Sequence, residues 1–139
     1  MIRLIKDEEL DLLKDDPVRP HLSWKWRRRS GREVYVLERE EKVAAVICVA
    51  FMDEVPASEL DMERQGMSHA IFYTVWSYDK GAGREIVLGI ANRLKMQRPW
   101  VKRFVTLSPL TEIAERFHLK NGAKFLAKYK DCQNFEYEL

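Results

Sequence analysis

The sequence has little of what builds a disulfide framework or a metal site. Its only cysteines are Cys48 and Cys132, no CxxC pair is present, and the 3 histidines do not cluster. Disulfide-stapled and zinc-binding proteins need closely spaced cysteines, or cysteines combined with histidines. We therefore expect no metal site, and thiols that stay reduced as they do in the cytoplasm.

Long hydrophobic runs are also missing. The longest strongly apolar stretch covers residues 43–52, whereas a helix needs roughly 20 apolar residues to span a bilayer. Met1 leads into Arg3, Lys6 and several acidic residues, which is not the pattern of a signal peptide. These absences predict a cytoplasmic protein with no membrane partner.

An excess of one sign of charge is absent as well. Lys and Arg together number 24, Asp and Glu number 22, and the formal net charge is +2. Long-range attraction to nucleic acid or to an anionic membrane needs a clear basic surplus. We expect no nucleic-acid partner, and the sequence leaves the oligomeric state open, a homodimer included.

What is present fits one compact domain. The chain has 139 residues, of which 46% are hydrophobic, enough for one core but not comfortably for two. It contains no internal repeat, low-complexity segment or interdomain linker. We expect a single domain over residues 1–139.

Runs of β-branched and aromatic residues alternate with amphipathic segments along the chain. Strands are predicted at residues 1–5, 33–38, 42–52, 69–78 and 101–107, with two short strands within 123–139. Helices are predicted at 6–16, 84–97 and 111–120, with one turn or a loop at 21–29 and a loop or short helix at 53–68. A charged turn at 39–41 would join two of the strands into a hairpin. This order predicts a mixed α/β (α+β) fold with a mostly antiparallel sheet.

Two glycines stand between a predicted strand and a predicted helix. Gly81 and Gly83 allow the backbone to approach a ligand closely, and the free amides of a helix N-terminus favour a phosphate. A strand-to-helix turn also needs glycine for backbone reasons alone. This segment, the glycine loop (residues 80–85), is thus either a pyrophosphate-binding loop or a plain turn.

The residues around these glycines resemble a known motif. Val75-x-Ser77-x-x-Lys80-Gly81-x-Gly83, followed by a helix, is similar to the V-x-P-x-x-[RQ]-G-x-G-x-[GA] motif of the GNAT superfamily of acyl-CoA-dependent acetyltransferases. Lys80 stands where arginine or glutamine is usual. Glu85 occupies the last small position, where a carboxylate would lie close to a pyrophosphate.

The resemblance implies a GNAT-like sheet of about six to seven strands flanked by helices. It implies that the strands at 69–78 and 101–107 run parallel and splay apart, leaving a cleft for acetyl-CoA or another acyl-CoA. The second partner would be an acceptor, the amine of a small molecule or of a protein. The implied cofactor-binding residues are Val75, Trp76, Ser77, Lys80, Gly81, Ala82, Gly83, Arg84 and Glu85.

A second segment, residues 114–123, is similar to the A-x-x-F-Y-x-K-x-G-F signature of the family's last helix. His118 falls where many members carry a tyrosine that protonates the departing CoA thiolate. A histidine with an ordinary pKa near 6.5 could serve in its place. A lone histidine is as often structural.

A closer resemblance, to the GNAT-fold catalytic domain of malonyl-CoA decarboxylase, covers residues 70–123. It rests on Ala-Ile-Phe-Tyr before the glycine loop, Phe-Val-Thr-Leu-Ser-Pro after it, and Phe-His-Leu-Lys-Asn-Gly-Ala. Ser108 and His118 match that family's catalytic serine and histidine. The family's Ile-Pro-Gly-Phe continuation after Ser-Pro and its long insertion before the histidine are absent here.

Three function classes follow from these resemblances. The leading one is acyl transfer from acyl-CoA to an unidentified acceptor, with proton transfer by His118 or Ser108. The others are a decarboxylase-like reaction of the same pair and a catalytically silent binding or structural protein, as among small GNAT-like proteins encoded by phages. The sequence identifies neither the acceptor nor the acyl group.

The remaining candidates are expected to have ordinary structural roles. Arg27, Arg28 and Arg29 form a basic run that usually lies on a solvated face, although it could hold the CoA 3′-phosphate or an acidic partner. Acidic residues of the loop before the third long strand are expected on the surface, where one could act as a base; they are Asp53, Glu54 and Glu59. Core or cleft-wall positions are expected for Trp24, Trp26, Phe72, Trp76 and Phe104.

Overall fold

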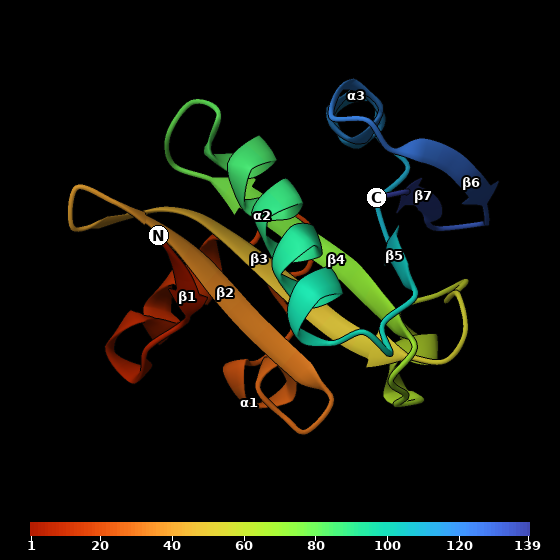
Figure 1. Cartoon of the computed structure of the whole chain (residues 1–139), viewed down its shortest axis with the longest axis horizontal. Helices are drawn as coiled ribbons and strands as arrows, with labels where there is room; N and C mark the ends of the chain where they lie inside the picture. Colours follow the sequence, from red (N-terminus) through yellow and green to blue (C-terminus); the bar gives the residue numbers. More distant parts are fainter.

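The computed structural model describes all residues from 1 to 139. One 7-stranded sheet runs through it in the order β1-β2-β3-β4-β5-β7-β6 (Figure 1). The strands are β1 (Ile2–Leu4), β2 (Arg32–Arg39), β3 (Lys42–Met52), β4 (His69–Ser77), β5 (Arg103–Thr106), β6 (Lys124–Lys128) and β7 (Gln133–Tyr137). Every neighbouring pair is antiparallel except β4 and β5, which are parallel. The predicted fold class and order of elements are confirmed.

Helices cover both faces of the sheet. Helix α2 (Ala82–Gln97) crosses one face, where it packs mainly on β3 and β4 (Figure 1). The other face is covered by the 3₁₀ helices η1 (Asp7–Asp15) and η2 (Leu60–Glu63) and the short helix α1 (Trp24–Arg27). Helix α3 (Glu112–Lys120) follows β5 and contacts β6. No helix has the length and apolar content that a membrane crossing requires.

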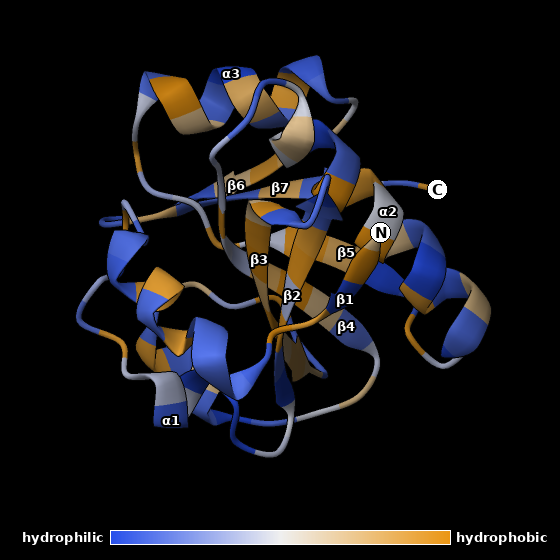
Figure 2. Ribbon diagram, turned by 90° about the vertical axis from the view of Figure 1, so that its left-hand side faces the viewer, coloured by the Kyte–Doolittle hydropathy of each residue, from blue (hydrophilic) through white to orange (hydrophobic).

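The central strand β3 is buried on both faces. Successive side chains of a strand point to opposite faces, so Ile47 and Val49 join the core under α2 while Val46 and Cys48 join the core on the other side. Figure 2 shows the middle strands mostly in the hydrophobic colour. A strand covered on both sides has a continuous apolar run, which is the pattern of residues 43–52.

The predicted hairpin forms between β2 and β3. Its turn residues Glu40 and Glu41 have φ values of 51° and 65°, the left-handed backbone that a two-residue hairpin turn requires. Neither is glycine, so the turn carries some backbone strain. This turn also brings Arg39, the last residue of β2, beside the glycine loop.

The parallel pair β4 and β5 diverges, as the resemblance implied. Pairing begins at His69 with Arg103 and ends at Phe72 with Thr106. Strand β4 continues to Ser77. It contains a β-bulge in its pairing with β3, where Tyr73 is the extra residue without a partner. A bulge bends its strand and increases the local twist. Beyond Phe72 the β5-facing edge of β4 therefore has no strand partner.

Three expectations from the sequence are wrong in detail. The predicted helix at 6–16 is a 3₁₀ run, because Leu10 and Leu13 are three residues apart and reach the core together in that geometry. Arg27 is not on a solvated face: its side chain is fully buried against Asp16. Trp24 is 45% exposed, since its helix turns Trp26 to the core instead.

Candidate functional site

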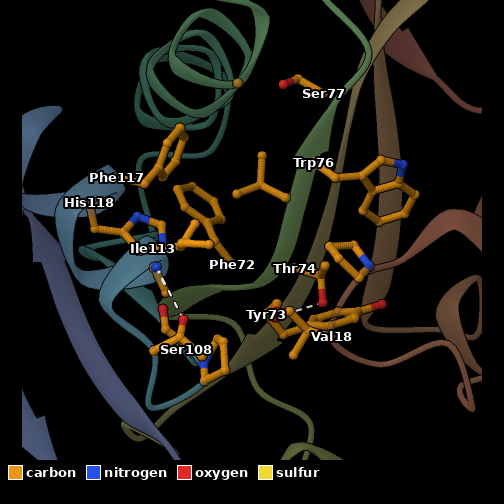
Figure 3. Close-up of a pocket in the computed structure, with 16 residues that line it drawn as sticks. Val18, Phe72, Tyr73, Thr74, Trp76, Ser77, Ser108, Ile113, Phe117 and His118 are labelled. Atoms are coloured by element: carbon orange, nitrogen blue, oxygen red, sulfur yellow. Dashed lines mark hydrogen bonds between the residues drawn. The ribbon is translucent and has the colours of Figure 1, made fainter.

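A cleft of about 490 Å³ opens where β4 and β5 diverge. Figure 3 shows Ser108, Ile113, Phe117 and His118 on one side and Tyr73, Thr74 and Trp76 on the other. The lining residues are Pro17, Val18, Phe72, Tyr73, Thr74, Val75, Trp76, Ser77, Gly83, Ser108, Pro109, Thr111, Ile113, Ala114, Phe117 and His118. Lysine and arginine are absent from this set, so the cleft suits an uncharged extended chain.

The predicted strand-end residues Val75, Trp76 and Ser77 all line the cleft. Val75 is partly buried against the core under α2, and the Trp76 indole Nε1 donates a 2.9 Å hydrogen bond to the Tyr78 hydroxyl. Tyr78 in turn donates to Asp15 at 2.6 Å, which ties the end of β4 to the end of η1. Burial and this bond raise the pKa of Tyr78 to about 12. The wall formed by β4 is thus anchored at its open end.

The glycine loop lies at the mouth of this cleft. Gly81 precedes α2 with φ of 77°, a conformation that glycine adopts without strain. Gly83 lines the cleft, and a Cβ there would come within 3.1 Å of the Phe117 ring. Gly81 is therefore favoured by its backbone angle, and a side chain at Gly83 would require a small shift of the Phe117 ring.

Three main-chain amides of this loop are free. The N–H groups of Gly81, Gly83 and Arg84 donate no hydrogen bond within the chain, whereas those of Ala82 and Glu85 bond to Asp79 and Gly81. Unpaired amides at the N-terminus of a helix bind anions, aided by the helix dipole. The arrangement has the donor set that a pyrophosphate needs.

The side chains of the loop are arranged around Arg39. Its guanidinium donates to Glu85 at 2.6 Å, to Asp79 at 3.0 Å and to the Lys80 carbonyl at 3.1 Å. The bonds to Glu85 and Asp79 raise the pKa of Arg39. The Glu85 carboxylate, expected to lie close to a pyrophosphate, therefore has a cationic partner.

The other predicted loop side chains lie outside the cleft. Lys80 and Arg84 are exposed, and Arg84 donates a 3.0 Å bond to Asn121 at the end of α3. Ala82 is fully buried in the core under α2. Of these three, only Lys80 has a side chain free to reach a ligand at the mouth.

Ser108 is a buried residue of the cleft wall, 3% exposed. Its hydroxyl donates to the Thr106 hydroxyl at 2.8 Å, and its backbone pairs with Gln133 of β7. The Thr106 hydroxyl also accepts from the Phe135 amide at 3.0 Å. Ser108 is thus held at the point where β5 ends, with its hydroxyl directed to Thr106.

His118 reaches the same cleft from α3. Its Nδ1 lies 2.7 Å from the Tyr137 hydroxyl, and its ring stacks on Phe135 with centroids 5.4 Å apart. Burial lowers its pKa to about 4, so the imidazole is neutral at neutral pH. Nε2 makes no hydrogen bond within the chain, and it acts as donor or acceptor according to the tautomer that Tyr137 selects.

Ser108 and His118 share the cleft but do not bond to each other. Each has another partner, Thr106 for the serine and Tyr137 for the histidine. The structure therefore brings both side chains to one cavity with the glycine loop, and leaves them as two separately held groups.

Each of the three acidic loop candidates is held by structural partners. Asp53 accepts bonds from Met67 and Ser68, and Glu54 pairs with Arg64 at 2.6 Å. None of the three carboxylates lines the cleft. Glu59 pairs with His21 at 2.8 Å and with Arg19 at 3.0 Å.

Three residues of the site gave no readable signal in the sequence. Tyr137 lies in the last strand, Arg39 ends a hairpin strand, and Arg19 stands between two prolines. Each acts on a residue far away in the chain, so no local spacing marks it.

Comparison with known proteins finds relatives in structure and none in sequence. No protein-family model and no curated protein matches the chain. Malonyl-CoA decarboxylase from Agrobacterium vitis superposes with a TM-score of 0.68 at 19% identity, over 84% of this chain and 35% of that one. The chain thus spans about a third of the length of that decarboxylase.

Two acetyltransferases match over nearly their whole length. A Bacillus subtilis acetyltransferase in complex with CoA has a TM-score of 0.65 at 14% identity, over 97% of this chain and 93% of that one. Ribosomal-protein-alanine N-acetyltransferase from Brucella melitensis has a TM-score of 0.65 at 13% identity, over 100% and 99%. With the parallel pair that diverges and the glycine loop at its mouth, these similarities establish that the chain has the GNAT fold.

Proposed function

We propose that this protein binds an acyl-CoA and transfers its acyl group to an acceptor. The observation that carries the proposal is the continuity of the free amides at Gly81, Gly83 and Arg84 with the apolar cleft between β4 and β5. A ligand fits this site if its pyrophosphate binds the free amides and its narrow, mostly uncharged arm lies in the apolar cleft. CoA is such a molecule, and its thioester supplies an activated acyl group.

Each part of the site has a separate task in this proposal. The three amides hold the pyrophosphate, and Lys80 adds a free positive charge at the mouth. Beyond the Tyr73 carbonyl, which Arg19 binds, the edge of β4 from Thr74 to Ser77 has no strand partner and offers main-chain groups to the amides of the arm. Ser108 and His118 lie deeper, where the acyl group and the acceptor would meet.

His118 is suited to act as a neutral group. A pKa of about 4 leaves little imidazolium at neutral pH, so a role as charged acid is disfavoured. A neutral imidazole held by Tyr137 can accept a hydrogen bond from an incoming amine or donate one to a developing negative charge. The acceptor is proposed to be an amine of a small molecule or of a protein.

The test is binding of CoA to the purified protein by calorimetry and by thermal unfolding. At a concentration 100 times the dissociation constant, a ligand that binds only the folded state adds about 2.7 kcal/mol to stability. We expect saturable binding and a rise in the midpoint temperature with both CoA and acetyl-CoA. Absence of both effects would leave a binding or structural protein with the GNAT fold.

The second candidate is decarboxylation of malonyl-CoA, favoured by the presence of Ser108 and His118 in one cleft. The absence of lysine and arginine from the cleft wall counts against it, because the malonyl carboxylate would have no cationic partner. Release of CO₂ from malonyl-CoA, lost in His118→Ala, would establish this reaction in place of acyl transfer.

A further inference from the structure

A buried guanidinium joins the two strands at the point where they diverge. Arg19 is 5% exposed and lies in the segment between η1 and α1. Its Nη2 donates to the Leu107 carbonyl at 2.9 Å, just past the end of β5. Its Nη1 donates to the Tyr73 carbonyl, at the bulge of β4, and lies 3.4 Å from the Thr74 hydroxyl.

The position of this contact along the strands is informative. The last ladder bond between β4 and β5 joins the Leu107 amide to the Phe72 carbonyl at 3.1 Å. The next groups along both edges are the two carbonyls that Arg19 binds. Two carbonyls cannot bond to each other, and paired strands lie only about 4.8 Å apart. A guanidinium inserted here bonds both edges and keeps them separate.

Arg19 is held in place through both its side chain and its main chain. Its Nε donates to Glu59 at 3.0 Å, the Arg19 amide donates to Asp16 at 2.8 Å, and the Arg19 carbonyl accepts from Arg27 at 2.6 Å. Arg27 and Asp16 form a 2.7 Å ion pair between side chains with no exposed surface. Arg19 therefore has a fixed orientation, and Val18 next to it is fixed on the cleft wall.

Stability alone does not account for this arrangement. A buried ion pair costs desolvation energy that hydrophobic side chains of similar volume avoid. Burial lowers the pKa of Arg19, and nearby Glu59 and Asp16 oppose that shift. What a hydrophobic side chain could not do is donate to carbonyls on two diverging strands at once.

Resting on the proposed function, we propose that Arg19 is a positioning residue that sets the width of the cleft at its closed end. It thereby determines how the arm of an acyl-CoA fits between β4 and β5. It does not touch the pyrophosphate site, because Gly81, Gly83 and Arg84 are absent from its contacts. The arm and the phosphates should therefore respond differently to its loss.

The test compares CoA with 3′-phospho-ADP, which carries the same phosphates and lacks the arm. Calorimetry on Arg19→Met should show CoA affinity reduced about tenfold, with the affinity for 3′-phospho-ADP within about twofold of wild type. Arg19→Lys should also weaken CoA binding selectively, since one ammonium is a point charge without the fork that spans both carbonyls. Arg103→Met is the matched control, because Arg103 pairs with Glu136 at the opposite end of β5.

Glu59→Gln provides a variant that folds even if Arg19 cannot be replaced, since Glu59 is partly exposed. It removes the carboxylate that orients the guanidinium, and it should lower the affinity for CoA about threefold without changing the affinity for 3′-phospho-ADP. An equal loss of affinity for CoA and for 3′-phospho-ADP would overturn the positioning role. So would unchanged CoA affinity in every Arg19 and Glu59 variant. Wild-type protein that binds neither ligand would instead contradict the proposed function itself.

Discussion

The Nδ1 atom of His118 lies 2.7 Å from the Tyr137 hydroxyl, and this buried pair links the last helix to the last strand. The bond satisfies the two groups without a charge. Burial lowers the pKa of His118 to about 4 and raises the pKa of Tyr137. An acid of ordinary pKa near 6.5, as the sequence suggested, is therefore not what the fold provides.

The lowered pKa of His118 predicts a pH dependence of stability. In the unfolded chain the imidazole binds a proton near pH 6.5, and in the folded chain only near pH 4. Stability is therefore fully present above pH 6.5 and falls as the pH drops from 6.5 to about 4. A shift of this size is worth about 3 kcal/mol. Urea unfolding at a series of pH values should show this loss in wild type and not in His118→Gln; parallel curves would contradict it.

The hydroxyl of Tyr137 is predicted to matter for turnover and not for binding. Tyr137→Phe removes the partner of Nδ1 and leaves the tautomer of His118 free. Release of free thiol from acetyl-CoA, measured with a panel of amines, should fall about tenfold, while CoA affinity stays unchanged. Tyr129→Phe is the control, since Tyr129 packs in the core on the other side of the sheet. Any acid limb of the activity profile should lie near pH 4 and not near neutrality.

The pair of Arg39 and Glu85 predicts a coupled effect on CoA binding. Arg39→Gln leaves the Glu85 carboxylate without its 2.6 Å partner beside the free amides, so affinity should drop about threefold. Glu85→Gln alone should change affinity little, and the double variant should return near wild type. A Glu85→Gln protein that binds CoA much more tightly than wild type would show that Arg39 does not offset the carboxylate.

Substitutions at Gly83 distinguish a pyrophosphate-binding loop from a plain turn. Gly83→Ala and Gly83→Asp both place a Cβ 3.1 Å from Phe117, and only the second adds a negative charge at the amides. We expect Gly83→Asp to lose CoA binding by about tenfold more than Gly83→Ala, with similar thermal midpoints for both. Equal CoA affinity in wild type and both variants would mean that the loop is only a turn.

The buried pair of Asp16 and Arg27 is predicted to be costly to break. Asp16→Ala leaves a fully buried guanidinium without its carboxylate, which should lower the free energy of unfolding by about 3 kcal/mol. Asp11→Ala serves as control, because Asp11 pairs with Lys14 on the surface and both side chains are over 80% exposed. A loss in Asp16→Ala no larger than in Asp11→Ala would show that the buried pair is compensated.

The helices and strands and their order could be predicted from the amino-acid sequence. The apolar run of β3, the charged hairpin turn and the strand, glycine loop and helix at 69–97 are local patterns, governed by periodicity and backbone preference. Ser108 and His118, which match the motifs of one family in sequence, both line the cleft.

The ion pairs and the orientation of the site depend on contacts between residues far apart in the chain. Arg27 belongs to a basic run in sequence, yet the fold buries it against Asp16. Arg39 meets Glu85, 46 positions along the chain, and Arg19 meets Leu107, 88 positions along. Burial, which lowers the pKa of His118, is likewise produced by Phe135 and Tyr137 from another element. Such long-range contacts depend on how the strands and helices pack together, and no spacing along the chain encodes them.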